Sequence, residues 1–327
     1  MTRIKTYQKI RPKDPILIAA WPGMGDVAIG AAKYLKDKLQ AKLFARLKSE
    51  RFFYETDVTV RENLIQLSGV PDGQFYYWPN PNEGNDLMIF INDLQPPPEK
   101  SLSYAQALIR FALSFKVKMS ITFAAMLTTM DYKQTPKVWA AATHRKIITD
   151  FKRINVRPMG SGQISGLNGL FLGVARKEGM PGICLLGEIP FYAAHVENPN
   201  ASLAILNTLT RFLRVPLDLS ELSLAAKAAR EEMAGLMEYV RESDMAVSEE
   251  PPKPINEEDI DRMKTILAAH SHTPSSIRRQ IEELFLKVKD RVCTAMDLKK
   301  KLDEWNVYKE YEDRFLELFR DDQIKNQ

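Results

Sequence analysis

The sequence contains little cysteine and no long run of apolar residues. Its 327 residues include two cysteines, Cys184 and Cys293, which are too few and too far apart for a disulfide framework and are typical of a reducing compartment. The N-terminus lacks the apolar segment of a signal peptide, and no later run approaches the roughly 20 apolar residues of a membrane span. The sequence therefore predicts a cytoplasmic protein without a membrane partner.

Signatures of metal, nucleotide and nucleic-acid binding are also missing. None of the four histidines forms a His-Glu-x-x-His pair or combines with cysteine at zinc-ligand spacing. The 46 basic residues nearly balance the 42 acidic ones, and this balance gives no reason to expect nucleic acid as a partner. Ser165 lacks the Gly-x-Ser-x-Gly elbow of a hydrolase nucleophile. We predict no metal, no cofactor and no catalytic residue.

Short apolar runs alternate with amphipathic segments over the first two thirds of the chain. Residues 15–20 form a continuously apolar run, typical of a strand covered on both faces, and apolar residues then recur at helical spacing up to Leu39. This alternation predicts an α/β fold with a mixed, mostly parallel sheet, in which Asp72-Gly73 marks an antiparallel excursion. Further strands are predicted at 43–47, 58–67, 86–91, 118–123 and 182–186, and helices at 101–114, 136–151 and 167–176.

The composition changes after about residue 216. Apolar residues at a spacing of three and four predict one long amphipathic helix between 222 and 240, and a proline-rich stretch at 249–255 predicts a linker. Further helices are predicted from Asn256 and Thr273. The chain end is also predicted to be helical, with Leu298, Leu302 and Trp305 among dense charges. We predict an α/β domain at 1–218 and an all-helical appendage at 219–327, which either packs on the domain or forms an arm for partners.

The first glycine-rich loop follows the first predicted strand. Gly23, Gly25 and Gly30 lie between that strand and a helix, where free amides and the helix dipole can hold an anion. The loop lacks the Gly-Lys-Ser/Thr ending of a phosphate loop, and the carboxylate of Asp26 can occupy the same amides. Two interpretations of this loop remain open, a structural turn and a ligand-binding loop.

A second glycine-rich loop, residues 161–169, has the same arrangement and contains Ser165 and Asn168 but no lysine or arginine. Gly169 and Gly173 lie four residues apart, on one helical face. Such spacing favours close packing of this helix on the sheet or on a neighbouring subunit.

The carboxyl ends of parallel strands meet at one edge of a sheet, which is the usual place for a site in this architecture. Asp93 and Glu188 are the carboxylates expected there. They can do acid-base work, although loop acids often cap helices or face water. The candidate ligand-binding residues are Gly23, Gly25, Asp26, Asp93, Ser165, Asn168 and Glu188.

Five blocks of this sequence resemble, in order, those of the proteasome assembly chaperone 2 family. They lie at residues 21–25, 84–96, 160–173, 182–188 and 198–202, within a match that covers about 14–222. The resemblance implies a phosphorylase/hydrolase-like three-layer α/β domain that forms homo-oligomers, often trimers. It also implies proteasome α-subunits, or another protein complex, as partners.

The resemblance supplies no catalytic residues. Family members that activate the proteasome can end in a hydrophobic-Tyr-any tail, whereas this sequence ends in Ile-Lys-Asn-Gln, so a contact through the domain or the helical region is expected instead. We therefore predict an oligomeric, non-catalytic scaffold or chaperone-like protein. The alternative is a small-ligand-binding protein or enzyme that holds a nucleotide, nucleoside or carboxylate at the carboxyl edge of the sheet.

Overall fold

The computed structural model forms two compact units, which are described separately. The first comprises residues 1–194 and 198–253, and the second comprises 195–197 and 254–327. Within them the structure describes residues 4–55, 58–61, 63–245, 281, 284–285, 287–288, 294–304, 311 and 314–315. In this part of the chain no helix combines the length and the apolarity that crossing a bilayer requires.

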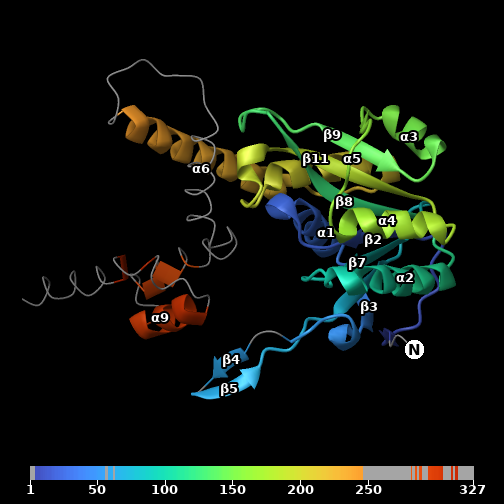
Figure 1. Ribbon diagram of the computed structural model, residues 1–327, viewed down its shortest axis with the longest axis horizontal. Helices are drawn as coiled ribbons and strands as arrows, with labels where there is room; N and C mark the ends of the chain where they lie inside the picture. Colours follow the sequence, from blue (N-terminus) through green and yellow to red (C-terminus); the bar gives the residue numbers. More distant parts are fainter. Residues whose placement is uncertain are drawn as a thin grey trace, which may run out of the picture. The chain divides into compact units, whose positions relative to one another are not determined.

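A nine-stranded mixed sheet forms the centre of the first unit (Figure 1). Its strands are β1 (Ile4–Thr6), β2 (Ile16–Ala20), β3 (Lys42–Leu47), β6 (Gly73–Trp78), β7 (Leu87–Ile91), β8 (Met119–Thr128), β9 (Val138–Ala142), β10 (Arg157–Pro158) and β11 (Gly182–Pro190). They lie in the order β1-β3-β6-β7-β2-β8-β11-β9-β10. The four central strands, β7, β2, β8 and β11, are mutually parallel, whereas β6 and β9 pair antiparallel on either side of them. The predicted mixed, mostly parallel sheet is confirmed.

Helices cover both faces of this sheet. The first apolar core lies under α1 (Val27–Lys38), α3 (Arg145–Lys152) and α5 (Pro199–Leu213), and the second lies under α2 (Pro98–Ser114) and α4 (Leu167–Lys177). Strands β2, β7 and β11 are buried at every position because helices cover them on both sides, which explains their continuously apolar sequences. The predicted α/β layers are confirmed.

One helix prediction is wrong. Residues 136–151 were expected to form a single helix, but strand β9 occupies their first part and α3 their last part. Strand β9 consists of Val-Trp-Ala-Ala-Ala, in which the alanines favour a helix by local propensity. The buried strand β11 needs hydrogen-bond partners on its outer side, and β9 supplies them in an antiparallel ladder from Val138 to Ala142.

The segment predicted as a strand at 58–67 forms a separate two-stranded antiparallel sheet. Its strands are β4 (Val58–Arg61) and β5 (Leu64–Leu67), and they lie outside the nine-stranded sheet. Figure 1 shows this hairpin projecting from the body of the first unit below β3. The antiparallel excursion expected in this region is therefore made by a projecting hairpin as well as by strand β6.

Helix α6 (Ser220–Met245) is the predicted long amphipathic helix. Leu222, Ala226 and Met233 are buried, and Arg230 donates a hydrogen bond of 2.6 Å from Nη1 to Oδ1 of Asn200 on α5. The first turns of α6 thus pack on the α/β body and belong to the first unit. The boundary between residues 218 and 219 stays a prediction based on composition.

The second unit has a small apolar core of its own. Helix α9 (Ala295–Glu304) places Leu298 and Leu302 against Ile281, Phe285 and Phe315. The helix predicted around Leu298 and Leu302 is confirmed. The predicted linker at 249–255, the helix starts at Asn256 and Thr273, and Trp305 lie outside the described residues.

Candidate functional site

The loops that follow β2, β7 and β11 meet at the carboxyl edge of the four parallel strands, as the sequence predicts. Gly25 joins two of these loops through its backbone. Its N–H donates to the carbonyl of Ala194 at 2.8 Å, and its own carbonyl accepts from the N–H of Asn198 at 2.8 Å. The site expected at this edge is thus a real meeting point of segments that are far apart in the sequence.

The first glycine-rich loop is tied down by protein acceptors. Gly25 is buried and has a φ of 61°, a left-handed conformation that favours glycine. Asp26 is exposed, and its N–H donates to the carbonyl of Gly23 at 3.0 Å. Because the amides of Gly25 and Asp26 already have acceptors within the chain, this geometry favours a structural turn over an anion cradle.

Asn168 fastens the same loop to helix α4. It is 4% exposed, and its side-chain amide pairs with the backbone of Trp21 in both directions, each hydrogen bond measuring 3.2 Å. The Thr122 hydroxyl donates to the Asn168 carbonyl at 2.8 Å. Asn168 is therefore a structural bridge between β2, β8 and α4, and its amide faces protein backbone.

Gln95 makes a second bridge, which the sequence did not single out. Its Nε2 donates to the carbonyl of Pro22 at 2.6 Å, and its Oε1 accepts from the N–H of Leu167, in the first turn of α4, at 2.8 Å. Gly166 permits this contact, since a Cβ there would lie 3.1 Å from Oε1 of Gln95. The available signal was the position of Gln95 two residues after Asp93, on the same loop. The neighbouring Ser165 is exposed.

The two nominated carboxylates do not come together. Asp93 forms an ion pair with Lys33 at 2.7 Å, and both side chains are at least half exposed. Glu188 is 7% exposed and accepts hydrogen bonds from the N–H of Lys137 at 3.0 Å and from Nε1 of Trp139 at 2.8 Å. Their strands, β7 and β11, are three steps apart in the sheet, or about 14 Å, which is too far for paired acid-base work.

The second glycine pair has two different environments. A Cβ at Gly169 would lie 2.4 Å from the carbonyl oxygen of Ile164, so the close packing is against the preceding loop. A Cβ at Gly173 would meet no described atom within 4 Å. Close packing of Gly173 on the sheet is therefore wrong, and its contact with a neighbouring subunit stays a prediction.

Exposed apolar side chains surround the carboxyl edge, and the sequence did not predict them. Met24 and Leu94 lie in the loops after β2 and β7, Leu127 lies near the end of β8, and Leu170 lies near the start of α4. They are 43%, 43%, 42% and 39% exposed, respectively. We call these four residues the apolar rim. A set of this kind on one edge is more typical of a protein contact than of a polar active site.

Reactive groups in the core are held in their neutral forms. Cys184 is fully buried, and burial raises the pKa of its thiol to about 12, so little nucleophilic thiolate forms near neutral pH. Burial also raises the pKa of the Tyr104 hydroxyl, which accepts a hydrogen bond from Nδ2 of Asn92 at 2.7 Å. In the described part of the chain no three His, Cys, Asp or Glu side chains are grouped as metal ligands.

A cavity of about 780 Å³ lies beside the outer strands β9 and β10. Lys152 near the end of α3 and Arg211 on α5 contribute to its lining, together with the residues before β9. None of the nominated ligand-binding residues lines this cavity. The sequence-based site and the cavity are therefore separate places on the first unit.

Comparisons with known proteins agree with this architecture. The chain is 31% identical to Pyrococcus furiosus PbaB, described as an archaeal proteasome activator, over 72% of this chain and 98% of that one, with a TM-score of 0.62. Pyrococcus furiosus PbaA, an archaeal homolog of proteasome-assembly chaperone, shares the fold at 22% identity, covering 75% and 95% of the two chains, with a TM-score of 0.57.

An uncharacterized Methanocaldococcus jannaschii protein, MJ1210, is 25% identical over 270 residues, which are 80% of this chain and 97% of that protein. The model of the PAC2 family matches residues 17–237, which include the nine-stranded sheet from β2 onward and most of α6. Since this match spans more than half of the sequence, the chain belongs to the PAC2 family.

Proposed function

We propose that this protein is an oligomeric, non-catalytic scaffold or chaperone-like protein of the cytoplasm that binds proteasome α-subunits or a related protein complex. A homo-oligomer, with a trimer favoured, is part of the proposal. The similarity to a proteasome activator at 31% identity supports the partner class. The proposal concerns binding of folded protein surfaces and assigns no catalytic step.

The observation that carries this proposal is the state of the carboxyl edge. Enzymes with parallel sheets use that edge to hold ligands with free amides and polar side chains. Here the amides of Gly25 and Asp26 and the side chains of Asn168 and Gln95 are paired within the protein. The exposed groups around them include the apolar rim, whose burial against a partner would be favourable.

Substitution of the rim tests the proposed contact. A Met24→Ser and Leu127→Ser double variant should keep its fold because both side chains are more than a third exposed. We expect its affinity for purified proteasome α-subunits, measured by calorimetry, to fall about tenfold or more. Leu224→Ser on α6, where Leu224 is 68% exposed, is the matched control and should bind as the wild type does.

Three results would contradict the proposal. A wild-type protein that binds neither isolated α-subunits nor assembled proteasome at about 100 μM would remove the proposed partner. Equal binding by the rim variant and the Leu224→Ser control would show that the carboxyl edge is not the contact surface. Turnover of a small molecule by the purified protein would contradict the non-catalytic assignment.

Small-ligand binding is a second candidate function, and the cavity beside β9 and β10 favours it. Its volume of about 780 Å³ falls in the range of ligand pockets, and Lys152 and Arg211 offer positive charge for an anionic group. A nucleotide or carboxylate that binds there should raise the melting temperature of the protein by mass action. The Arg211→Ala variant should lose that shift, whereas Asp93→Ala should keep it.

A further inference from the structure

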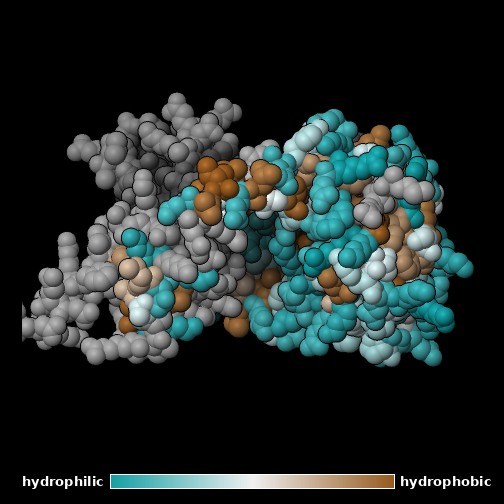
Figure 2. Space-filling model, turned by 90° about the horizontal axis from the view of Figure 1, so that it is seen from below, coloured by the Kyte–Doolittle hydropathy of each residue, from teal (hydrophilic) through white to brown (hydrophobic). Residues whose placement is uncertain are grey.

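The β4–β5 hairpin, which we call the arm, carries an apolar face that the first unit leaves open. In its antiparallel register Val58 lies opposite Leu67, and Val60 lies opposite Ile65. Since side chains alternate between the two faces of a strand, these four residues share one face. They are 57%, 67%, 63% and 73% exposed, respectively. Figure 2, which views the molecule from below, shows hydrophobic residues gathered at the projecting hairpin.

The opposite face of the arm is more polar. Thr59 lies opposite Gln66 there and Arg61 lies opposite Leu64, which is 63% exposed. The Thr59 hydroxyl forms a hydrogen bond of 2.8 Å with the Ser68 hydroxyl. A ribbon with one apolar and one polar face normally packs its apolar face on a core. A two-stranded hairpin is marginally stable in water without such a cover. The arm therefore has the pattern of an element that is buried on one side.

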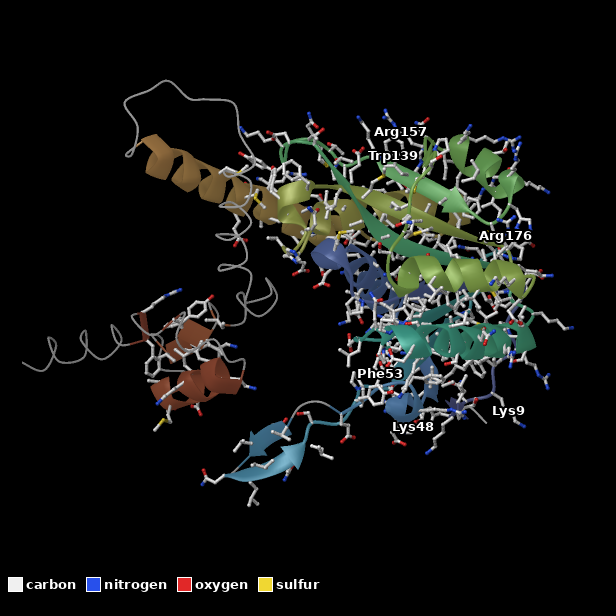
Figure 3. All side chains as sticks on the ribbon, in the orientation of Figure 1. Lys9, Lys48, Phe53, Trp139, Arg157 and Arg176 are labelled. Atoms are coloured by element: carbon white, nitrogen blue, oxygen red, sulfur yellow. The ribbon has the colours of Figure 1, made fainter. Side chains whose placement is uncertain are left out.

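The root of the arm, formed by the segments on either side of it, is fixed to the first unit. Ser49 is buried and donates from its N–H to Oδ1 of Asp72 at 3.1 Å and from its hydroxyl to the carbonyl of Pro71 at 2.6 Å. Lys48 forms an ion pair with the same carboxylate at 2.9 Å. Figure 3 labels Lys48 and Phe53 at this root, where Phe53 is buried beside Tyr104. These contacts hold the residues just before and just after the arm on the first unit.

The charge of the arm suits contact with an identical copy. Two copies of one chain bring like charges together wherever a charged patch meets itself, and such contacts are unfavourable. The four residues of the apolar face carry no charge, and the sequence between Val58 and Leu67 contains one arginine and one glutamate, which balance. This surface can therefore meet its own copy without like-charge repulsion.

The arm supplies more than half of the apolar area that a stable contact between two copies needs. With about 100 Å² for an aliphatic side chain, the four residues of its apolar face expose roughly 260 Å². A standard interface buries about 800 Å² per partner, of which somewhat more than half is apolar.

We propose that the apolar face of the arm packs against a second copy of this chain and holds the protein as an oligomer. The inference rests on the oligomeric part of the proposed function and names its surface. It leaves the apolar rim at the carboxyl edge for the protein partner. Self-association and partner binding then depend on different residues and can be lost separately.

Sedimentation of the full-length protein tests the proposal. In a Val60→Thr and Ile65→Thr double variant, threonine keeps the strand preference of the arm and removes its apolar contact. We expect the constant for self-association to fall about 30-fold or more. A Thr59→Ser and Gln66→Thr double variant changes the opposite face and should associate as the wild type does. A wild type that is monomeric at about 50 μM, or an arm variant that associates like this control, would overturn the proposal.

Photo-crosslinking identifies which chain covers the apolar face of the arm. With benzoylphenylalanine in place of Ile65, products that contain two copies of this chain support the proposal. Products within one chain, from the arm to residues 254–327, or products with another protein would overturn it. Binding of α-subunits, measured on the same wild-type samples, separates the two claims. An oligomer that depends on the arm but binds no α-subunit contradicts only the partner, whereas a wild-type monomer that binds α-subunits contradicts only the arm.

Discussion

The carboxyl edge of the sheet and the arm differ in whether the protein itself supplies contacts for their side chains. At the edge, the glycine-rich loops look like a ligand site in the sequence, but their polar groups are paired within the protein through Asn168, Gln95 and Ala194. In the arm, four aliphatic side chains that usually fill a core remain more than half exposed. The comparison indicates that Gly25 and Gly166 serve packing of the backbone at the edge, whereas the arm offers the exposed apolar surface that the proposed contact requires.

This difference also separates two kinds of residue that carry function in a scaffold. Residues of the edge position the surface and are expected to affect folding when they change. Residues of the arm and of the apolar rim contact solvent in this chain, so their substitution should change association without changing the fold. The four predictions below challenge this separation, beginning with the largest expected effect.

Asn168→Ala should give the largest loss of stability at the carboxyl edge. It leaves both the N–H and the carbonyl of Trp21 unpaired in a buried place, which costs about 2–5 kcal/mol of unfolding free energy. Urea denaturation followed by circular dichroism measures the change, with the exposed neighbour Ser165→Ala as the control, expected to lie within about 0.5 kcal/mol of wild type. If Asn168→Ala is as stable as its control, the edge is not held together as described, and the comparison fails.

Gly187→Ala should destabilise the protein by about 1–3 kcal/mol through overpacking. A Cβ at this position would lie 2.9 Å from Cβ of Ala201 and 3.0 Å from the Ala201 carbonyl, so helix α5 would have to move away from β11. Gly173→Ala is the matched glycine control at an exposed position, and it should stabilise helix α4 by about 0.5–1 kcal/mol. Thermal unfolding of both variants is the measurement. A Gly173→Ala protein that loses its oligomeric state would instead reveal a subunit contact at α4.

Alkaline pH should weaken the fold through Cys184. Its thiol pKa is raised by burial from 9.0 to about 12, so the folded state keeps a proton that the unfolded state loses. This stabilisation is fully present below about pH 9 and is lost as the pH rises towards 12. At pH 10 the loss of unfolding free energy is about 1 kcal/mol. Denaturation midpoints between pH 8 and 10 should decline more steeply for wild type than for Cys184→Ala. Parallel slopes would show that Cys184 is not responsible.

Asp93→Asn should have the smallest effect of the four. Its ion pair with Lys33 is exposed to solvent, so removing it should cost less than about 1 kcal/mol, and the difference should shrink further in high salt. Denaturation at two salt concentrations measures this change. Loss of partner binding or of any activity in Asp93→Asn with an intact fold would restore a chemical role to the edge. That outcome would contradict the view that the polar groups of the edge serve structure alone.

Much of the fold was predictable because periodicity is a local property. Strand β2 and helices α1, α2, α4 and α6 follow apolar spacings that lie within one segment of sequence. Strand β9 was missed because its alanines favour a helix locally, and its strand conformation is decided by the distant strand β11. The meeting of the loops at one edge followed from the parallel strands, which the sequence did predict.

The roles of the candidate site residues were less predictable because they depend on partners far along the chain. Nothing near Asn168 in the sequence indicates that its amide faces the backbone of Trp21, and nothing near Asp93 indicates Lys33. Alternating apolar residues at Val58 and Val60 predict a strand with one buried face. Their exposure could be recognised only after the root of the arm had been placed.

The double backbone contact of Gly25 has a consequence for synthesis on the ribosome. The loop that starts α1 is completed by the carbonyl of Ala194 and the N–H of Asn198, which are made about 170 residues later. At about 5–20 residues per second, the central strand β2 and helix α1 wait roughly 10–35 seconds for these partners. During that interval the nascent chain exposes apolar segments that the finished domain covers, so we expect this protein to need protection while it is being made.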